Sequence, residues 1–459
     1  GSLSSQPISL NKTTENYFVT ETGSNGILNQ YIAESSNKSN TSTAYGSVFY
    51  QYKPDEKNSI NTNFTFSNYR CQTFNLYKDL LLNNRNEEEK DDKNTTDFFL
   101  EYAHTFKNKI NLQAGYGNSW QKLHSTYIVE SMSAPFTYSD FRNKLYAYFS
   151  WQKNKTFGIK FGGVAETSSP NAGGQKNSYI IFQPYADIKY QPWKSLDFKV
   201  KYRSESNYPN ISQTNPFSSV IDLHSIRTGN PNLKPEVTHK ISLQTNILRG
   251  LITIEPYYQF SNNYITETGA LRPDNIFEYT YSNAGNYRKY GVEARFSVPI
   301  AKVFFLQANA DLNSGYINYA GKTNHVNDWA MLGSFIYQNQ KKYTMTGFQY
   351  QKNMRKSITA QGYNKDDVDF WIIFLKQPFF KQRLSVMLLY FVPLNWGVEQ
   401  YQGSYIKTDL YTESRKYDVG IIKNFLMLEV SFRFNKGKSI AKTEKNIEIK
   451  KERDSRNVF

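Results

Sequence analysis

The sequence lacks the features of most enzymes and of helical membrane proteins. It has one cysteine, Cys71, and therefore no internal disulfide and no CxxC motif. No run of 18 or more apolar residues occurs, which excludes a transmembrane helix because such a span needs about 20 apolar residues. The five histidines are scattered, and neither an HExxH motif nor a serine-centred nucleophile elbow is present. The sequence therefore predicts neither an enzyme nor a metal or cofactor site.

Mean hydropathy is low, but aromatic residues are abundant. The mean hydropathy is −0.65, whereas 36 Tyr and 32 Phe help to bring the aromatic fraction to 16%. A disordered chain would be poor in aromatic residues. Low hydropathy with many aromatics is typical of a transmembrane β-barrel, in which alternate residues face lipid and aromatic girdles mark both interfaces.

The net charge of +15 indicates an acidic partner of some kind. A basic balance is compatible with nucleic acid, an anionic membrane surface or acidic ligands. No nucleic-acid-binding motif accompanies the charge. We therefore expect contact with outer-membrane lipid and with the phosphates of lipopolysaccharide, and no contact with nucleic acid.

The dominant pattern is strict alternation of apolar and polar residues over segments of about ten residues. One such segment places on a single face Phe304, Leu306, Ala308, Ala310 and Leu312. Ten residues are the length that a tilted strand needs to cross a bilayer, whereas strands of soluble proteins are mostly shorter. The pattern predicts an all-β fold, a transmembrane antiparallel β-barrel of an outer membrane with roughly 16–22 strands.

Short and long breaks alternate between these segments. The expected short turns are 107–109, 153–155, 192–194, 249–250 and 341–342. The expected long loops are 78–96, 167–176, 207–232, 266–276, 319–328 and 399–416. Since outer-membrane barrels have short periplasmic turns and long extracellular loops, we expect the lysine-rich turns to face the periplasm.

One loop carries an acidic run that includes Glu87, Glu88, Glu89, Asp91 and Asp92. It is interpreted as a solvated loop tip. The alternative is a divalent-cation site that bridges to lipopolysaccharide.

Charged residues on the polar faces are candidates for lining the lumen and meeting substrate. They are Lys199, Lys201, Arg203, Glu255 and Asp311. The first three form a basic stripe on one expected strand. That stripe could favour an acidic substrate, or it could pair with acids on a neighbouring strand.

A more specific signal lies between the strands. The stretch 228–236 reads TGNPNLKPE and contains Gly229, Asn230, Pro231, Asn232, Leu233, Lys234, Pro235 and Glu236. Its glycine and prolines interrupt regular strand, its asparagines suit turns, and alternation resumes from Val237. This motif resembles the barrel segment of TonB-dependent receptors, in the outer membrane β-barrel family, where it closes a long external loop and launches a strand. The resemblance covers roughly residues 96–459.

The resemblance also implies a plug domain of over a hundred residues ahead of the barrel, with a segment that contacts TonB. Residues 1–45 are too few to hold one and are interpreted as leading strands or a linker. Residues 46–434 are the expected barrel, and residues 435–459 a basic C-terminal tail. We therefore expect the C-terminal part of a longer receptor, or a relative without its plug.

The resulting functional hypothesis is the barrel of a TonB-dependent receptor, which actively imports a scarce nutrient across the outer membrane. The resemblance implies the TonB complex as a partner, through an upstream plug, and a surface lipoprotein is a further candidate partner. A passive porin or a surface ligand-binding platform is the alternative.

Overall fold

The computed structural model describes most of the chain. The described residues are 2–23, 26–78, 85–129, 132–222, 224–339, 341–380, 382–392, 401–409, 411–418 and 424–433. The expected basic tail, residues 435–459, lies outside them. Among the described residues, no helix combines the length and the apolar character needed to span a membrane.

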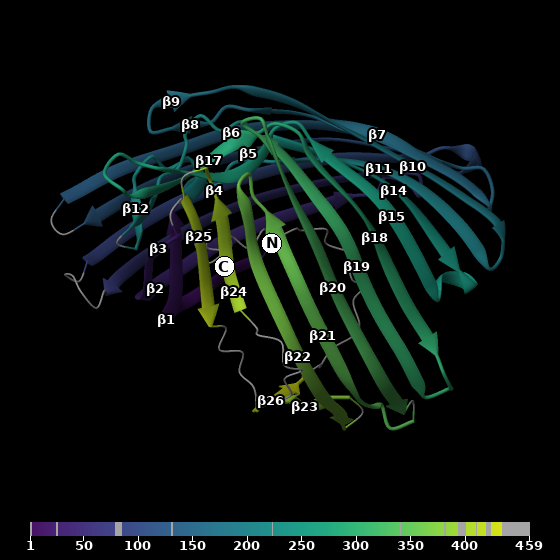
Figure 1. The fold of residues 1–459 in the computed structure, drawn as a ribbon. Helices are drawn as coiled ribbons and strands as arrows, with labels where there is room; N and C mark the ends of the chain where they lie inside the picture. The colour runs from purple at the N-terminus through teal and green to yellow at the C-terminus, as the bar shows by residue number, and fades with distance from the viewer. Residues whose placement is uncertain are drawn as a thin grey trace.

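Long antiparallel strands make up the wall of the molecule (Figure 1). Their bounds are β1 Ser2–Gly23, β2 Gly26–Tyr52, β3 Asn58–Lys78, β4 Arg85–Thr105, β5 Ile110–Val129, β6 Met132–Gln152, β7 Phe157–Ser168, β10 Tyr179–Trp193, β11 Leu196–Asn207, β14 Glu236–Ile247, β15 Ile252–Ser261, β18 Tyr287–Pro299, β19 Phe304–Tyr319, β20 Lys322–Asn339, β21 Thr344–Ile358, β22 Gly362–Phe379, β23 Leu384–Val392, β24 Tyr401–Lys407, β25 Tyr411–Asp418 and β26 Phe425–Phe432. Each pairs with the next wall strand in sequence order up to β22. The predicted all-β barrel architecture is confirmed.

Smaller elements occupy the connections between wall strands. They are the hairpin β8 Asn171–Ala172 and β9 Gln175–Lys176, the helix α1 Ile211–Thr214, the strands β12 Ser219–Asp222, β13 Ser225–Arg227, β16 Tyr264–Leu271 and β17 Phe277–Ala284, and the 3-10 turns η1 Lys107–Lys109 and η2 Leu248–Gly250.

The last two strands of the wall are each divided into two pieces. β23 and β24 pair with different parts of β22, β26 pairs with β23, and β25 pairs with β24. β25 also pairs with residues 17–23 of β1, so the last and first strands of the wall are joined along this stretch. Counted in this way, the described wall has sixteen continuous and two divided strands, within the predicted range.

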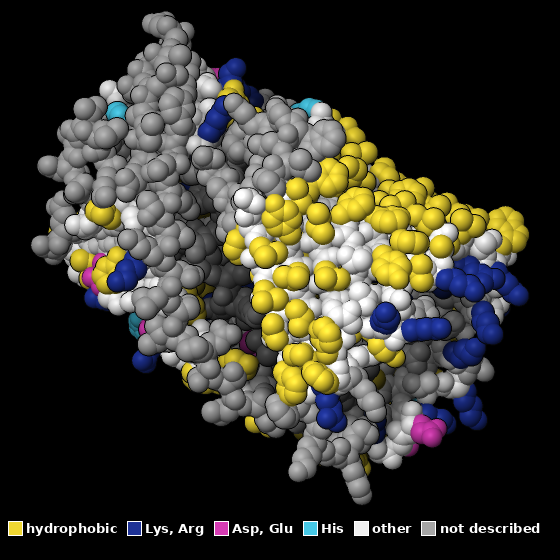
Figure 2. Space-filling view, turned by 90° about the horizontal axis from the view of Figure 1, so that it is seen from below, with side chains coloured by type: hydrophobic (Ala, Val, Ile, Leu, Met, Phe, Trp, Pro, Cys, Tyr) yellow, Lys and Arg dark blue, Asp and Glu magenta, His cyan; other side chains and the backbone are white. Residues whose placement is uncertain are grey.

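The two faces of the wall differ as the alternation predicts. On β19, Leu306 and Leu312 are exposed on the outer face, whereas Asn313 is buried and Asp311 contacts other inner-face residues. Exposed apolar side chains recur on most wall strands and form the apolar surface in yellow in Figure 2. This surface is the part of the wall that lipid would cover, because it would be costly to leave in water.

Alternate connections of the wall lie at the same end, because neighbouring strands are antiparallel, and at one end the eight connections between described wall strands are all short. They join β2 to β3, β4 to β5, β6 to β7, β10 to β11, β14 to β15, β18 to β19, β20 to β21 and β22 to β23. We call this the turn end and the opposite end the loop end. The five predicted short turns are confirmed, and the loop 207–232 lies at the loop end.

Three of the predicted long loops are wrong in part. Residues 85–96, including the acidic run, belong to β4 and pair with β3 and β5. β19 and β20 are joined by the tight turn Ala320–Gly321, and most of residues 399–416 form β24 and β25. β4 extends well beyond the bilayer, since its 21 residues span about 70 Å. Strand that stands in water can be polar on both faces, so polarity alone is a poor sign of a loop.

The N-terminal segment was interpreted as leading strands or a linker. In the structure, residues 2–23 and 26–45 form strands. The domain boundaries themselves stay a prediction.

Candidate functional site: the loop sheet at the mouth of the barrel

Two long connections at the loop end fold together into a second sheet. The connection from β11 to β14 contributes α1, β12 and β13, and the connection from β15 to β18 contributes β16 and β17. The four strands lie in the order β12–β13–β17–β16, with β13 parallel to β17. We call this unit, residues 209–235 and 262–286, the loop sheet. Figure 1 shows β12 and β17 at the end of the molecule where β25 lies.

The TGNPNLKPE motif fixes the return of the first connection to the wall. The amide of Gly229 donates to the carbonyl of Asn215 at 2.9 Å. A β-carbon at Gly229 would lie 2.8 Å from the Ser212 carbonyl oxygen and closer still to that of Asn215, so only glycine fits this close approach. The carboxamide oxygen of Asn230 accepts from the amide of Asn232 at 2.9 Å and closes a turn.

The same motif joins the two connections. The Asn230 side chain donates to the Tyr281 carbonyl at 2.9 Å. The Asn283 side chain accepts from the amide of Lys234 at 2.8 Å and donates to its carbonyl at 2.9 Å. At the start of β14, the buried Glu236 carboxylate accepts from the amide of Ile265 at 3.1 Å. The motif is therefore a clamp between β14 and the β16–β17 hairpin.

A buried ionic cluster attaches the loop sheet to β25. Arg415, 3% exposed, pairs with Asp222 of β12 at 2.6 Å and donates to the Ser225 hydroxyl at 2.7 Å. Arg415 also pairs with Glu413, which accepts from the hydroxyl of Tyr279 of β17. Burial opposes the charge of Glu413, but the Arg415 guanidinium and these hydrogen bonds outweigh it and lower the pKa of the carboxyl.

Apolar contacts attach the loop sheet to three parts of the wall. Phe277 stacks on Tyr411 of β25, with ring centroids 4.4 Å apart. Ala284 packs with Tyr287, Ile317 and Ile358, which come from three wall strands. Ile211 and Phe217 of the first connection pack against a cluster that includes Leu123 and Phe136 of β5 and β6. Contacts with β5–β6, β18–β21 and β24–β25 hold the loop sheet across the mouth.

Polar contacts reach a fourth part of the wall. The Gln361 side chain accepts from the amide of Gly269 at 2.7 Å and donates to its carbonyl at 3.1 Å. The amide of Ala360 donates to the Thr266 hydroxyl at 2.9 Å. Both contacts join β16 to the connection between β21 and β22, and they satisfy backbone groups that burial would otherwise leave unpaired.

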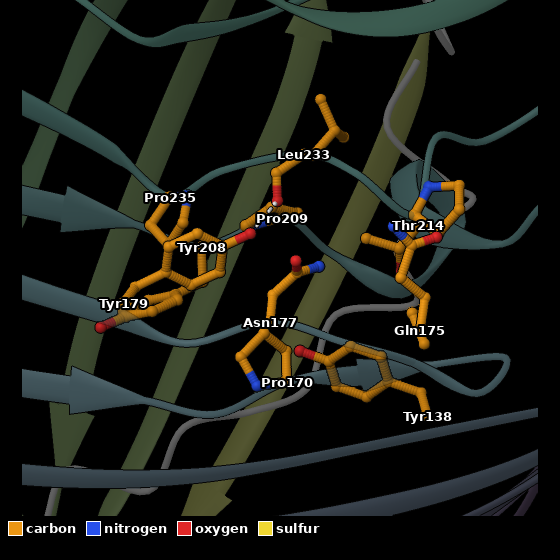
Figure 3. Close-up of a pocket in the computed structure, with 12 residues that line it drawn as sticks. Tyr138, Pro170, Gln175, Asn177, Tyr179, Tyr208, Pro209, Thr214, Leu233 and Pro235 are labelled. Atoms are coloured by element: carbon orange, nitrogen blue, oxygen red, sulfur yellow. Dashed lines mark hydrogen bonds between the residues drawn. The ribbon is translucent and has the colours of Figure 1, made fainter.

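A pocket lies where the motif meets the β8–β9 hairpin (Figure 3). Tyr, Pro and amide side chains dominate its lining, which consists of Tyr138, Pro170, Ala172, Gln175, Asn177, Tyr179, Tyr208, Pro209, Thr214, Pro231, Leu233 and Pro235. Figure 3 shows the Asn177 amide pointing into the group of rings. Such a lining suits a small group with apolar faces and hydrogen-bonding edges.

The five charged candidates all lie on the inner wall in ion pairs. Lys199 and Arg203 both pair with Asp187 of the neighbouring β10, the former at 2.8 Å. Lys201 pairs with Glu255 at 3.0 Å, across β14. The predicted basic stripe is thus matched by acids on nearby strands, one of the two alternatives.

Asp311 lies further along the same wall. It accepts from Arg355 of β21 at 2.7 Å, and Arg355 also contacts Asp328 at 3.2 Å. Additional pairs join Lys240 to Glu293 and Lys352 to Asp367. From β10 to β22 the inner wall is therefore a polar lining with many paired charges.

Within the described ranges, no group of three or more His, Cys, Asp or Glu side chains could hold a metal ion. The acidic run lies along β4, where Glu88 accepts from Gln72 at 2.6 Å and Asp92 pairs with Arg70 at 3.1 Å.

Glu413 and Arg415 were not predicted as site residues, because residues 399–416 were expected to form a loop. Their signal was alternation: Tyr411, Glu413 and Arg415 on one face, against Thr412 and Ser414 on the other. All three of the first set are buried.

A wall of tilted antiparallel strands with an apolar outer face, a polar inner face and a loop sheet at its mouth defines an outer-membrane β-barrel protein. Residues 55–426 match the model of the outer membrane protein beta-barrel family, and the chain belongs to that family. The predicted location in the outer membrane is confirmed.

Solved structures show the same fold at low identity. The copper transporter OprC is 9% identical with a TM-score of 0.56, over 89% of this chain and 80% of that one. The ferripyoverdine receptor of Pseudomonas aeruginosa is 9% identical with a TM-score of 0.50, over 89% of this chain and 72% of that one. No curated protein matches the sequence. The resemblance to TonB-dependent receptors is confirmed at the level of the fold, and by name these two neighbours are a copper transporter and a ferripyoverdine receptor.

Proposed function

We propose that this chain is the outer-membrane barrel of a TonB-dependent receptor that actively imports a scarce nutrient. The loop sheet is the observation that carries the proposal. Two long loops fold across the mouth, attach to several parts of the wall and stand above a polar lining. A passive porin needs an open path, whereas an importer needs an external recognition surface above a gated one.

We propose further that the plug domain and its TonB-contacting segment are absent from this chain. Residues 2–23 and 26–45, the stretch ahead of the expected barrel, pair as strands and leave no room for such a domain there. The resident wall charges, Lys199, Lys201, Arg203, Glu255 and Asp311, would then line the permeation path. Because they are paired, they would position water and polar groups without selecting one sign of charge.

A surface ligand-binding platform is the second candidate, and the pocket beside the motif favours it. Its Tyr, Pro and amide lining could hold part of a ligand without passage through the lumen. In that case detergent-solubilised protein would bind ligand, while cells would not accumulate it.

The test compares this chain with one that carries a family plug domain fused ahead of residue 1. In liposomes, the chain alone should leak small solutes or fail to close, and the fusion should be sealed. In cells, uptake should require both the fusion and TonB. TonB-dependent uptake by the chain alone would contradict the absence of the plug. Uptake by the fusion that is independent of TonB would support a porin instead.

A further inference from the structure

The turn end of the barrel is strongly and asymmetrically basic. Among the described residues of its eight connections, twelve Lys or Arg side chains are exposed, against two acids, Asp55 and Glu56. These cations are Lys53, Lys57, Lys107, Lys109, Lys153, Lys155, Lys194, Arg249, Lys302, Lys341, Lys342 and Arg383. The three long connections at the loop end, residues 169–178, 208–235 and 262–286, hold four basic and four acidic residues. The described residues of the eight turn-end connections therefore carry a net charge of +10 (12 − 2), whereas the three long loop-end connections carry none.

Exposed apolar side chains flank these cations. In seven of the eight connections, an exposed apolar side chain lies within three residues of a Lys or Arg. These side chains are Tyr52, Phe106, Trp193, Leu248, Ile300, Tyr343 and Phe380. Figure 2 shows Lys and Arg side chains gathered along the edge of the apolar surface. A large apolar side chain with an adjacent cation is the combination that lies at a membrane interface, with the ring or aliphatic group in the acyl boundary and the charge among headgroups.

The backbone conformation is an independent indication that large apolar side chains have a role in these turns. Leu248, Tyr343 and Phe380 have φ angles of 53°, 56° and 51°, in the left-handed region that favours glycine or asparagine. A bulky residue is strained in this conformation. Its presence at three separate turns is explained if the side chain inserts into a membrane interface, which glycine could not do.

We propose that the turn end binds the anionic phospholipid headgroups of the leaflet that surrounds it. The apolar side chains fix the depth of the turns at the edge of the acyl region. The cations then lie at the level of the phosphates and attract lipids with net negative charge over zwitterionic ones. The barrel would thereby collect a ring of anionic lipids at this end only, whatever it transports.

The test measures lipid selectivity of the full chain refolded in phosphatidylcholine vesicles. Spin-labelled phosphatidylglycerol and phosphatidylcholine report the relative association constant at the protein surface. The turn variant, K107Q/K109Q/K155Q, removes three cations from two turns. The matched control, K176Q/R272Q/K322Q, removes three cations from the loop end. Each variant is run on a gel unheated and boiled. Slower migration of the boiled sample than of the unheated one confirms that the variant is a folded barrel.

The unaltered chain should prefer phosphatidylglycerol, and salt should weaken the preference. The turn variant should lower the preference at the altered sites by about fivefold each, the effect of about one cation beside an anionic surface. The control should keep the original preference. Equal selectivity for the two lipids in the unaltered chain, or an equal loss in the control, would overturn the proposal. Retained selectivity in a folded turn variant would overturn it as well.

Discussion

Gly229 shows how one residue controls the shape of the first long connection. Its missing side chain lets the backbone of the motif approach α1 and the residue that follows it, Asn215. The amide of Gly229 would lose its hydrogen bond to Asn215 if the two segments moved apart. Glycine here serves close packing, not an unusual backbone angle.

We expect Gly229→Ala to destabilise the docked loop by about 1–3 kcal/mol, because the β-carbon would overlap two carbonyl oxygens. The measurement is the temperature at which the loop sheet becomes sensitive to trypsin, with cleavage after Arg227 identified by mass spectrometry. Gly333→Ala is the control, since a β-carbon at that position meets nothing within 4 Å. An unchanged temperature for Gly229→Ala would show that the motif adapts without cost.

At the scale of elements, the loop sheet depends on a buried charge cluster that no single element could hold. Arg415 of β25 contacts Asp222 of β12, while Glu413 of β25 contacts Tyr279 of β17. Each charge is acceptable in a buried position only because the others are present. Losing one member should therefore release the whole unit.

We expect Arg415→Met to cost about 3–5 kcal/mol of docking free energy, since it leaves Glu413 and Asp222 buried without their cation. Trypsin should then cleave after Arg227 in the otherwise folded barrel. The control is Lys322→Gln, which removes the exposed ion pair with Asp409 and should cost below about 1 kcal/mol. Equal resistance of both variants to trypsin would mean that apolar contacts alone dock the sheet.

The pH dependence of docking follows from Tyr264 of the loop sheet, which is partly buried and stacks on Tyr287 of the wall. Burial, with a smaller effect from Glu236, raises the pKa of Tyr264 to about 12 from its ordinary 10.0. Between pH 10 and about 12, Tyr264 would be ionised in the undocked state and protonated in the docked state. The undocked state then binds fewer protons, so its stability relative to the docked state rises as pH increases. Docking should be complete below pH 10 and weaken as pH rises through about 12.

The expected loss from Tyr264 alone is about 3 kcal/mol. Ionic conductance of the reconstituted chain between pH 9 and 12 measures it, because undocking opens the mouth. Tyr264→Phe should move the conductance rise to higher pH, since phenylalanine cannot ionise. A conductance that is flat across this range would contradict the assignment.

At the scale of the whole molecule, wall and loop sheet are separable. β15 pairs directly with β18, with Ser261 opposite Tyr287, so the ladder does not need residues 263–285. The wall gains its stability from strand pairing and from the apolar outer face in lipid. The loop sheet adds a cover at the mouth.

Replacing residues 263–285 with a two-residue Asn-Gly turn should leave a folded barrel with a several-fold higher conductance. The β16–β17 hairpin supplies two of the four strands across the mouth, and its loss also removes the partner of the motif. Single-channel recording in planar bilayers makes the comparison. As a control, removal of the β8–β9 hairpin, which pairs with the wall strand β6, should change conductance far less. Equal effects of the two deletions would show that the β16–β17 hairpin does not occlude the lumen.

The sequence by itself determined the class of fold and much of the layout. Alternation identified strands such as β11 and β19 and divided their residues between two faces, because a strand has a period of two. Lysine-rich breaks located the turn end, and the TGNPNLKPE motif located the clamp. These are local signals, carried by residues close together in the chain.

Tertiary structure decided the rest, because it depends on contacts between residues far apart. The partners of Lys199 and Arg203 follow from strand register, and the pairing with Asp187 appears only when β10 and β11 are aligned. The docking of the loop sheet on β25 brings Asp222 to Arg415, and the Tyr411 hydroxyl donates to Glu21 across 390 positions. Alternation places Tyr411, Glu413 and Arg415 on one face of a strand, but only the docking of the loop sheet on β25 buries them.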